Sequence, residues 1–178
     1  ISPAGWRRAA HKCSDLVYSR LSGESGYFDS RIVYVAESGP RTKRVKRLAV
    51  MDQDGANHRF LTSGQSLVLM PRFSPVSETL SYMSFAGDRP RVMIYNISTG
   101  AQETVGAFES MSFAGRFSPD GRTLVFSVTR AGNADIYAYD VASRTTRRLT
   151  SGNAIDTSPS YSPDGRRIVF ESDRGGSQ

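Results

Sequence analysis

Residues 116–129 read RFSPDGRTLVFSVT, and the chain contains this sequence nearly three times. An earlier copy, RFSPVSETLSYMSF, covers residues 72–85, and a later copy, SYSPDGRRIVFESD, covers residues 160–173. The equivalent aromatic residues of the three copies lie 44 residues apart, at Phe73, Phe117 and Tyr161. A period in the low forties that is made of short strands is typical of a β-propeller blade.

The second half of the unit repeats with the same period. It reads RLAVMDQDGANHRFLT at 47–62, RVMIYNISTGAQETVG at 91–106 and DIYAYDVASRTTRRLT at 135–150. We therefore predict a mainly β fold, namely a partial β-propeller of four-stranded antiparallel blades with a 44-residue repeat, preceded by one amphipathic helix. The predicted blades cover about residues 31–64, 65–108 and 109–152, and half a blade covers residues 153–178.

The turn between the first two strands of each unit has its own sequence signal. Ser-Pro-Asp-Gly, at 118–121 and again at 162–165, has proline at the second turn position and glycine where the chain reverses. Residues 74–77 read SPVS and keep only the proline half, so we expect a looser turn there. In the middle unit we expect the four strands at 116–118, 123–128, 135–140 and 146–149.

The N-terminal segment predicts the helix. Apolar residues spaced three and four apart form one stripe, which contains Trp6, Ala10, Cys13, Val17 and Leu21. Ser2 and Pro3 suit the start of a helix, and Gly23 suits its end. We expect the stripe, including the thiol of Cys13, to be buried. Residues 1–30 are then the last helix of a truncated N-terminal α/β domain and its linker.

Composition limits the classes of function. The net charge is +6, but the basic residues are scattered, which favours a solvated basic face over an acidic protein partner and disfavours nucleic acid. The single cysteine permits no internal disulfide. No apolar run approaches the length of a membrane span. Because propellers close into rings of roughly four to eight blades, we expect the chain to be a fragment whose open sheet edges allow self-association.

Three further segments carry a resemblance to a known family. MDQDGAN (51–57), DTSPSYSPDG (156–165) and SDRGGSQ (172–178) resemble the TolB family, the periplasmic propeller proteins of the Tol-Pal system. The resemblance implies a non-enzymatic periplasmic scaffold that supports outer-membrane integrity and cell division. It also implies binding of Pal, the peptidoglycan-associated lipoprotein, and of other Tol proteins.

The sequence predicts no enzyme, no cofactor and no metal site. His11 and His58 have no motif partners, and the chain has no HExxH, P-loop or GxSxG sequence. The aspartates of the turns suit turn structure, with a channel cation as the lesser alternative. The alternative function is the propeller gate of a prolyl-oligopeptidase-like serine peptidase, which shares such blade repeats and requires a downstream hydrolase domain.

A docking face follows from strand order. In an up-down blade, the connections from strand 2 to 3 and from strand 4 to the next strand 1 share one face, and we expect them to be longer and more varied than the turns on the other face. The candidate partner-binding residues are Leu69, Met70, Arg89, Arg91, Met111, Phe113, Ala114, Arg130, Asp156 and Thr157. Leu69, Phe113 and Thr157 are equivalent positions of successive units. The alternative is that these side chains only fill the channel. The basic loop at 41–47 is expected to be solvent-exposed.

Overall fold

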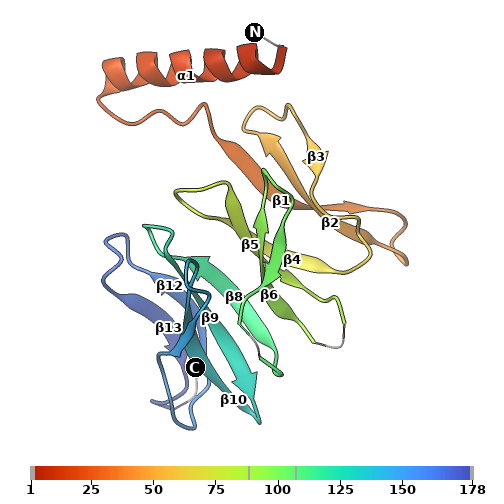
Figure 1. The fold of residues 1–178 in the computed structure, drawn as a ribbon, viewed down its shortest axis with the longest axis vertical. Helices are drawn as coiled ribbons and strands as arrows, with labels where there is room; N and C mark the ends of the chain where they lie inside the picture. Colours follow the sequence, from red (N-terminus) through yellow and green to blue (C-terminus); the bar gives the residue numbers. More distant parts are fainter. Residues whose placement is uncertain (1–2, 88, 107, 177–178) are drawn as a thin grey trace.

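The structure is a computed structural model that describes residues 3–87, 89–106 and 108–176. Within these ranges one helix, α1 (Pro3–Ser22), precedes four antiparallel sheets that lie one after another in chain order (Figure 1). The first sheet contains β1 (Arg31–Ser38), β2 (Val45–Asp52) and β3 (Arg59–Phe60). The second contains β4 (Val68–Phe73), β5 (Thr79–Ser84), β6 (Arg91–Asn96) and β7 (Gln102–Thr104). The third contains β8 (Ser112–Phe117), β9 (Thr123–Arg130), β10 (Asn133–Asp140) and β11 (Thr146–Arg148), and the fourth contains β12 (Asp156–Tyr161) and β13 (Ile168–Ser172).

The sheets repeat as the sequence does, which confirms the partial propeller. In each of the last three sheets the first strand pairs with the second in the same register, as the pairs Leu69–Met83, Phe113–Ser127 and Thr157–Glu171 show. Each pair lies 44 residues after the one before it. The 44-residue period is therefore the period of the blades.

The hydrophobic core lies in the seams between neighbouring blades. One cluster joins the second and third blades around Phe126, and another joins the first and second blades around Leu48 and Leu80. All three side chains are fully buried. The hydroxyl of Ser81 on β5 donates a hydrogen bond to the carbonyl of Gly115 on β8, at 2.9 Å, and so ties the two blades at their inner ends. Face-to-face packing of sheets thus stabilises the array.

The turns behave as their sequences predict. In the SPDG turn of the third blade, the amide of Gly121 donates to the carbonyl of Ser118 at 2.9 Å, and Gly121 has a φ of 68°. The same bond joins Gly165 to Ser162. At SPVS the flanking strands still close through the amide of Ser74 and the carbonyl of Thr79, but the described residues show no turn bond from position 77 to position 74. This turn is looser, as expected.

The innermost strands begin earlier than predicted. β8 begins at Ser112 rather than at residue 116, and β4 and β12 are displaced in the same direction. The reason is a β-bulge in each strand, where the register shifts by one residue. The bulge residues Met70 and Ser158 both have a φ of 53°. Leu69, Phe113 and Thr157 therefore lie in strands, although the sequence analysis placed them in connecting segments.

The connections on the predicted docking face are not uniformly long. β9 and β10 are joined by Ala131 and Gly132 alone, with φ values of 46° and 89°, which is the geometry of a tight type I′ turn. The prediction of a longer connection is wrong here. The connections at 39–44 and 85–90 are longer.

The helix lies beside the first blade, and its apolar stripe does not pack against that blade (Figure 1). Polar groups face the first blade and the linker: His11 lies 3.3 Å from Asp54 of the blade, and Asp15 accepts from the amide of Phe28 in the linker at 2.6 Å. The apolar stripe points to solvent, with Trp6 67% and Leu21 84% exposed. Cys13 is exposed too, so its predicted burial is wrong in this structure. The helix ends at Gly23, with a φ of 76°, as predicted, whereas Ser2 lies outside the described residues.

Candidate partner-binding site

The candidate residues gather where the innermost strands begin. Leu69, Phe113 and Thr157 occupy the same bulge position on β4, β8 and β12, and each side chain is partly buried. Because innermost strands surround the central channel of a propeller, these three positions lie around its mouth. The spatial equivalence predicted from the 44-residue period is therefore observed.

Among the candidate residues, two methionines present exposed apolar surface at this end. Met70 is 58% exposed and lines a hollow of about 110 Å³ between blades, whereas Met111 precedes β8 and is 39% exposed. Methionine adapts its shape to a contacting surface, which suits a binding site. Ala114 stands at the bulge of β8, but its side chain lies outside the described residues.

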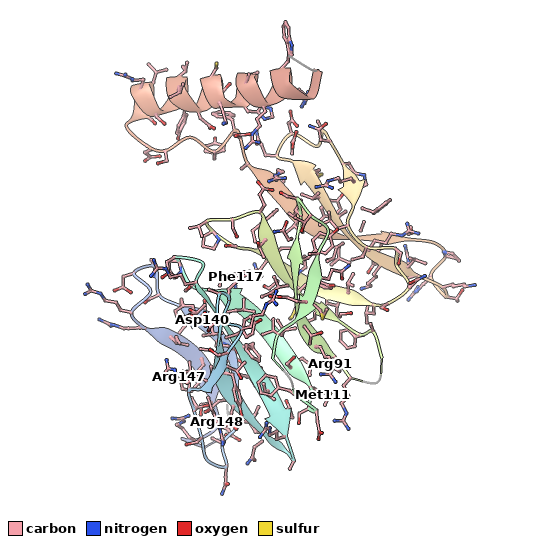
Figure 2. The ribbon with its side chains drawn as sticks, in the orientation of Figure 1. Arg91, Met111, Phe117, Asp140, Arg147 and Arg148 are labelled. Atoms are coloured by element: carbon pink, nitrogen blue, oxygen red, sulfur yellow. The ribbon has the colours of Figure 1, made fainter. Side chains whose placement is uncertain are left out.

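Arg91 and Met111 come from adjacent blades and lie at the same end of the structure, whereas Phe117 lies at the opposite end of β8 (Figure 2). The amide of Ser112 donates to the carbonyl of Pro90 at 3.1 Å, which draws the start of β8 against the start of β6. The Nη1 of Arg91 donates to the carbonyl of Phe108 at 2.6 Å. Arg91 is thus fixed by the connection that leads into the third blade.

A hollow of about 460 Å³ opens beside Arg91. It is lined by Ala86, Gly87, Arg89, Arg91 and Glu109. Arg89 is exposed and has no ion pair among the described residues, so its charge is free for a partner.

Arg130 reaches the same region from the third blade. It is the last residue of β9 and is exposed. The neighbouring amide of Thr129 donates to the carbonyl of Met111 at 3.0 Å, so Met111 lies between the strand ends that carry Arg91 and Arg130. An apolar centre with a basic rim is the resulting arrangement.

Asp156 is placed differently from the other candidates. Its side chain is only 2% exposed, and its Oδ2 accepts from Arg174 at 2.6 Å. Burial alone raises the pKa of this carboxyl, but the side chains of Ser172, Arg174 and Thr150 outweigh it and lower the pKa. The Oδ1 atom is buried and has no hydrogen bond of normal geometry among the described residues. Asp156 therefore holds Arg174, whose side chain is 55% exposed.

Arg174 is an exposed arginine near this face that the sequence analysis did not name as a candidate. It lies 18 residues after Asp156 on a different strand end, and it also stacks over the ring of Phe170, with its Cζ 5.2 Å from the ring centroid. The 44-residue period could have identified Arg174, which is the equivalent of Arg130, but not its partner, because the equivalent of Asp156 in the preceding blade is Ser112. The preceding blade also contains an arginine–aspartate ion pair, Arg148 with Asp135 at 2.6 Å, but these two residues are not the repeat equivalents of Arg174 and Asp156.

The described residues hold little that could perform chemistry. They contain no cluster of three or more histidine, cysteine, aspartate or glutamate side chains that could hold a metal ion. His58 packs edge-on against Phe60, with ring centroids 4.9 Å apart. Asp120 and Asp164 each cap their own turn, where the side chain of Ser118 or Ser162 and a backbone amide lower the pKa of the carboxyl. In the same ranges, no helix has both the length and the hydropathy that a membrane span requires.

Comparison with known proteins gives the family. The model of the TolB β-propeller domain matches residues 18–178. The Tol-Pal system protein TolB of Zymomonas mobilis is 62% identical over 100 residues, which are 56% of this chain and 22% of that relative. The crystal structure of TolB from Acinetobacter baumannii superposes with a TM-score of 0.79 at 36% identity, over 96% of this chain and 43% of that one.

A likeness to the tricorn protease is more distant. Its crystal structure gives a TM-score of 0.64 at 18% identity, over 82% of this chain and 14% of that protein, which shows a shared fold alone. The chain spans less than half the length of the Zymomonas mobilis and Acinetobacter baumannii proteins. Because the family model covers most of the chain, the chain belongs to the TolB β-propeller family.

Proposed function

We propose that this chain is part of a non-enzymatic component of the Tol-Pal system that works as a binding scaffold in the periplasm. Membership of the TolB family and the names of the relatives support this assignment. The resemblance to the TolB family implies its role, which is to maintain the outer membrane and to support its constriction at cell division.

The partner that we propose is Pal, the peptidoglycan-associated lipoprotein, docked on the face that carries the candidate residues. The observation that carries the proposal is the exposed Met111 between Arg91 and Arg130. An apolar centre with a polar rim is the arrangement of protein–protein interfaces, and a few central side chains contribute most of the binding energy.

The charge of the rim indicates the chemistry of the partner surface. Arg89 and Arg130 are exposed and form no ion pair among the described residues, and Arg174 remains half exposed beside Asp156. Basic rim residues accelerate encounter with an acidic surface and make the association rate depend on salt. We therefore expect an acidic patch on Pal opposite these arginines.

Titration of the purified periplasmic domain of Pal, followed by calorimetry, tests the proposal. Met111→Ala should weaken binding by about tenfold or more, as expected when a central contact is truncated. Phe113→Ala should do the same, although its partial burial makes it the less clean variant. The matched control is Val76→Ala, because Val76 is 64% exposed at the opposite end of the blades. An equal loss for control and test variants, or no loss for either test variant, would refute docking at this face.

The alternative function is the propeller gate of a serine peptidase. It is supported by a likeness of fold alone, at 18% identity to the tricorn protease, whereas the relatives with high identity are TolB proteins. A nucleophile elbow in the same polypeptide would favour the peptidase, and Pal binding would favour the scaffold.

We also propose that residues 1–30 are the end of a separate N-terminal domain and its linker. The exposed apolar stripe of α1 supports this, because such a stripe is stable in water only when another surface covers it. The free edge of β13, where Val169 is 69% exposed, supports self-association of the chain in isolation. Gel filtration that shows only a monomer at high concentration would contradict self-association.

A further inference from the structure

Two arginines occupy one level of the central channel. Arg72 on β4 and Arg116 on β8 are equivalent positions one repeat apart, and Ser160 on β12 is the next equivalent. All three belong to innermost strands, which line the channel of a propeller. Both arginines line a hollow of about 240 Å³ near the SPDG turns, together with Ser160. Both also line the hollow of about 110 Å³ toward Met70, so they form a layer between the two hollows.

The bulges explain why the arginines point into this space. Leu69 pairs with Met83 and Arg72 pairs with Ser81, so the register shifts by one residue between them. Two residues three apart normally lie on opposite faces of a strand, but one extra residue puts them on the same face. Arg72 thus shares the face of Leu69, toward the third blade, and Arg116 is placed in the same way on β8.

Among the residues that the structure describes, neither guanidinium lies against a carboxylate. Arg72 and Arg116 form no ion pair among the described residues, and the residues lining the two hollows include no aspartate or glutamate. In contrast, Arg148 on the outermost strand of the third blade is paired with Asp135. Burial, and then the charge of Arg72, lower the pKa of Arg116. Arg72 is exposed and Arg116 is partly buried, so solvent screens their repulsion only in part, and an anion between them would remove the rest.

We propose that this layer is an anion-binding site for a small oxyanion, such as phosphate or the carboxylates of a small polyacid. A guanidinium presents its N–H groups in a planar fork that matches two oxygens of such a group, and two forks from adjacent blades can share one anion. The hydroxyl of Ser160 is a further donor in the same hollow. The site lies on the channel wall and does not depend on the docking of Pal.

Binding of inorganic phosphate and of succinate, measured by calorimetry at constant ionic strength, tests the inference. The two probes distinguish a phosphate site from a carboxylate site. Arg72→Gln and Arg116→Gln should each raise the dissociation constant of the preferred anion at least tenfold. Arg116→Lys should be intermediate, because it keeps the charge but loses the fork. Arg41→Gln is the matched control, because Arg41 is an exposed arginine on the connection between β1 and β2, and it should change nothing.

Thermal unfolding provides a second measurement, which distinguishes loss of the anion site from a folding defect. In buffer without polyvalent anions, Arg116→Gln should melt no lower than the wild type, because it removes a repulsion. With phosphate present, the wild type should melt higher than the variant. Absence of anion binding, or equal binding by the wild type and both glutamine variants, would overturn the proposal.

Discussion

Alanine at Gly115 should weaken the seam between the second and third blades. A Cβ at this position would lie 2.7 Å from Cγ1 of Val92 and 3.2 Å from Cδ2 of Leu124. Both neighbours are fully buried, so neither can move into solvent. The φ of Gly115 is outside the left-handed region, so the backbone itself tolerates alanine. The cost is therefore that of overpacking, about 1–3 kcal/mol, which corresponds to a loss of about 2–12 °C in Tm at this chain length.

Urea and thermal unfolding, followed by circular dichroism, measure this cost. The matched control is Gly175→Ala, since Gly175 also lacks a positive φ and a Cβ there would meet no atom within 4 Å. The control should stay within about 0.5 kcal/mol of the wild type. Val92→Ala, combined with Gly115→Ala, should cost less than the two changes separately, because one makes the room that the other needs. Equal unfolding midpoints for the two glycine variants would refute the reasoning.

Three further changes test other parts of the structure. Phe126→Ala should lower the free energy of unfolding by about 3–5 kcal/mol, because this fully buried ring packs between blades 5.7 Å from the ring of Phe108; a loss under about 1 kcal/mol in urea unfolding would contradict that packing. The lowered pKa of Asp156 means that its contribution to stability is present above the unfolded-state pKa and is lost as the pH falls through the folded-state value. Unfolding measured from pH 5 to pH 2 should therefore be less pH-dependent in Asp156→Asn than in the wild type, and identical slopes would count against the pair with Arg174. Cys13 should react with a maleimide in the native chain nearly as fast as in urea, because it is exposed, whereas protection of the thiol would show that α1 is covered.

The repeat could be predicted because blades impose it directly on the sequence. Phe73, Phe117 and Tyr161 recur every 44 residues because each blade packs the same position against its neighbour. The glycine of SPDG is equally readable, since a positive φ at Gly121 is a local requirement. Such features depend on nearby residues and leave a mark in the sequence. The ends of the inner strands do not, because the bulges at Met70 and Ser158 carry no glycine.

The helix shows a different limit of sequence reasoning. An apolar stripe indicates that one face of a helix is covered, but it does not indicate which neighbour covers it. In the structure the polar side of α1 contacts the first blade, through Asp54 with His11, and the linker, through the amide of Phe28 with Asp15. The pattern therefore identified the helix and its end at Gly23 correctly, while the burial of Cys13 was wrong.

The arginine layer depends both on the repeat, which the sequence shows, and on the bulges, which it does not. Arg72 and Arg116 stand directly before the aromatic residue in each copy of RFSP, and the sequence analysis assigned them no role. Strict alternation from Leu69 would put Arg72 on the other face of the strand, and only the one-residue shift at the bulge brings the two to the same face. A repeat places equivalent side chains around one axis, so a charge that is harmless in one blade becomes a layer when neighbouring blades carry it too. Positions of this kind are recognised only when the period and the register are considered together.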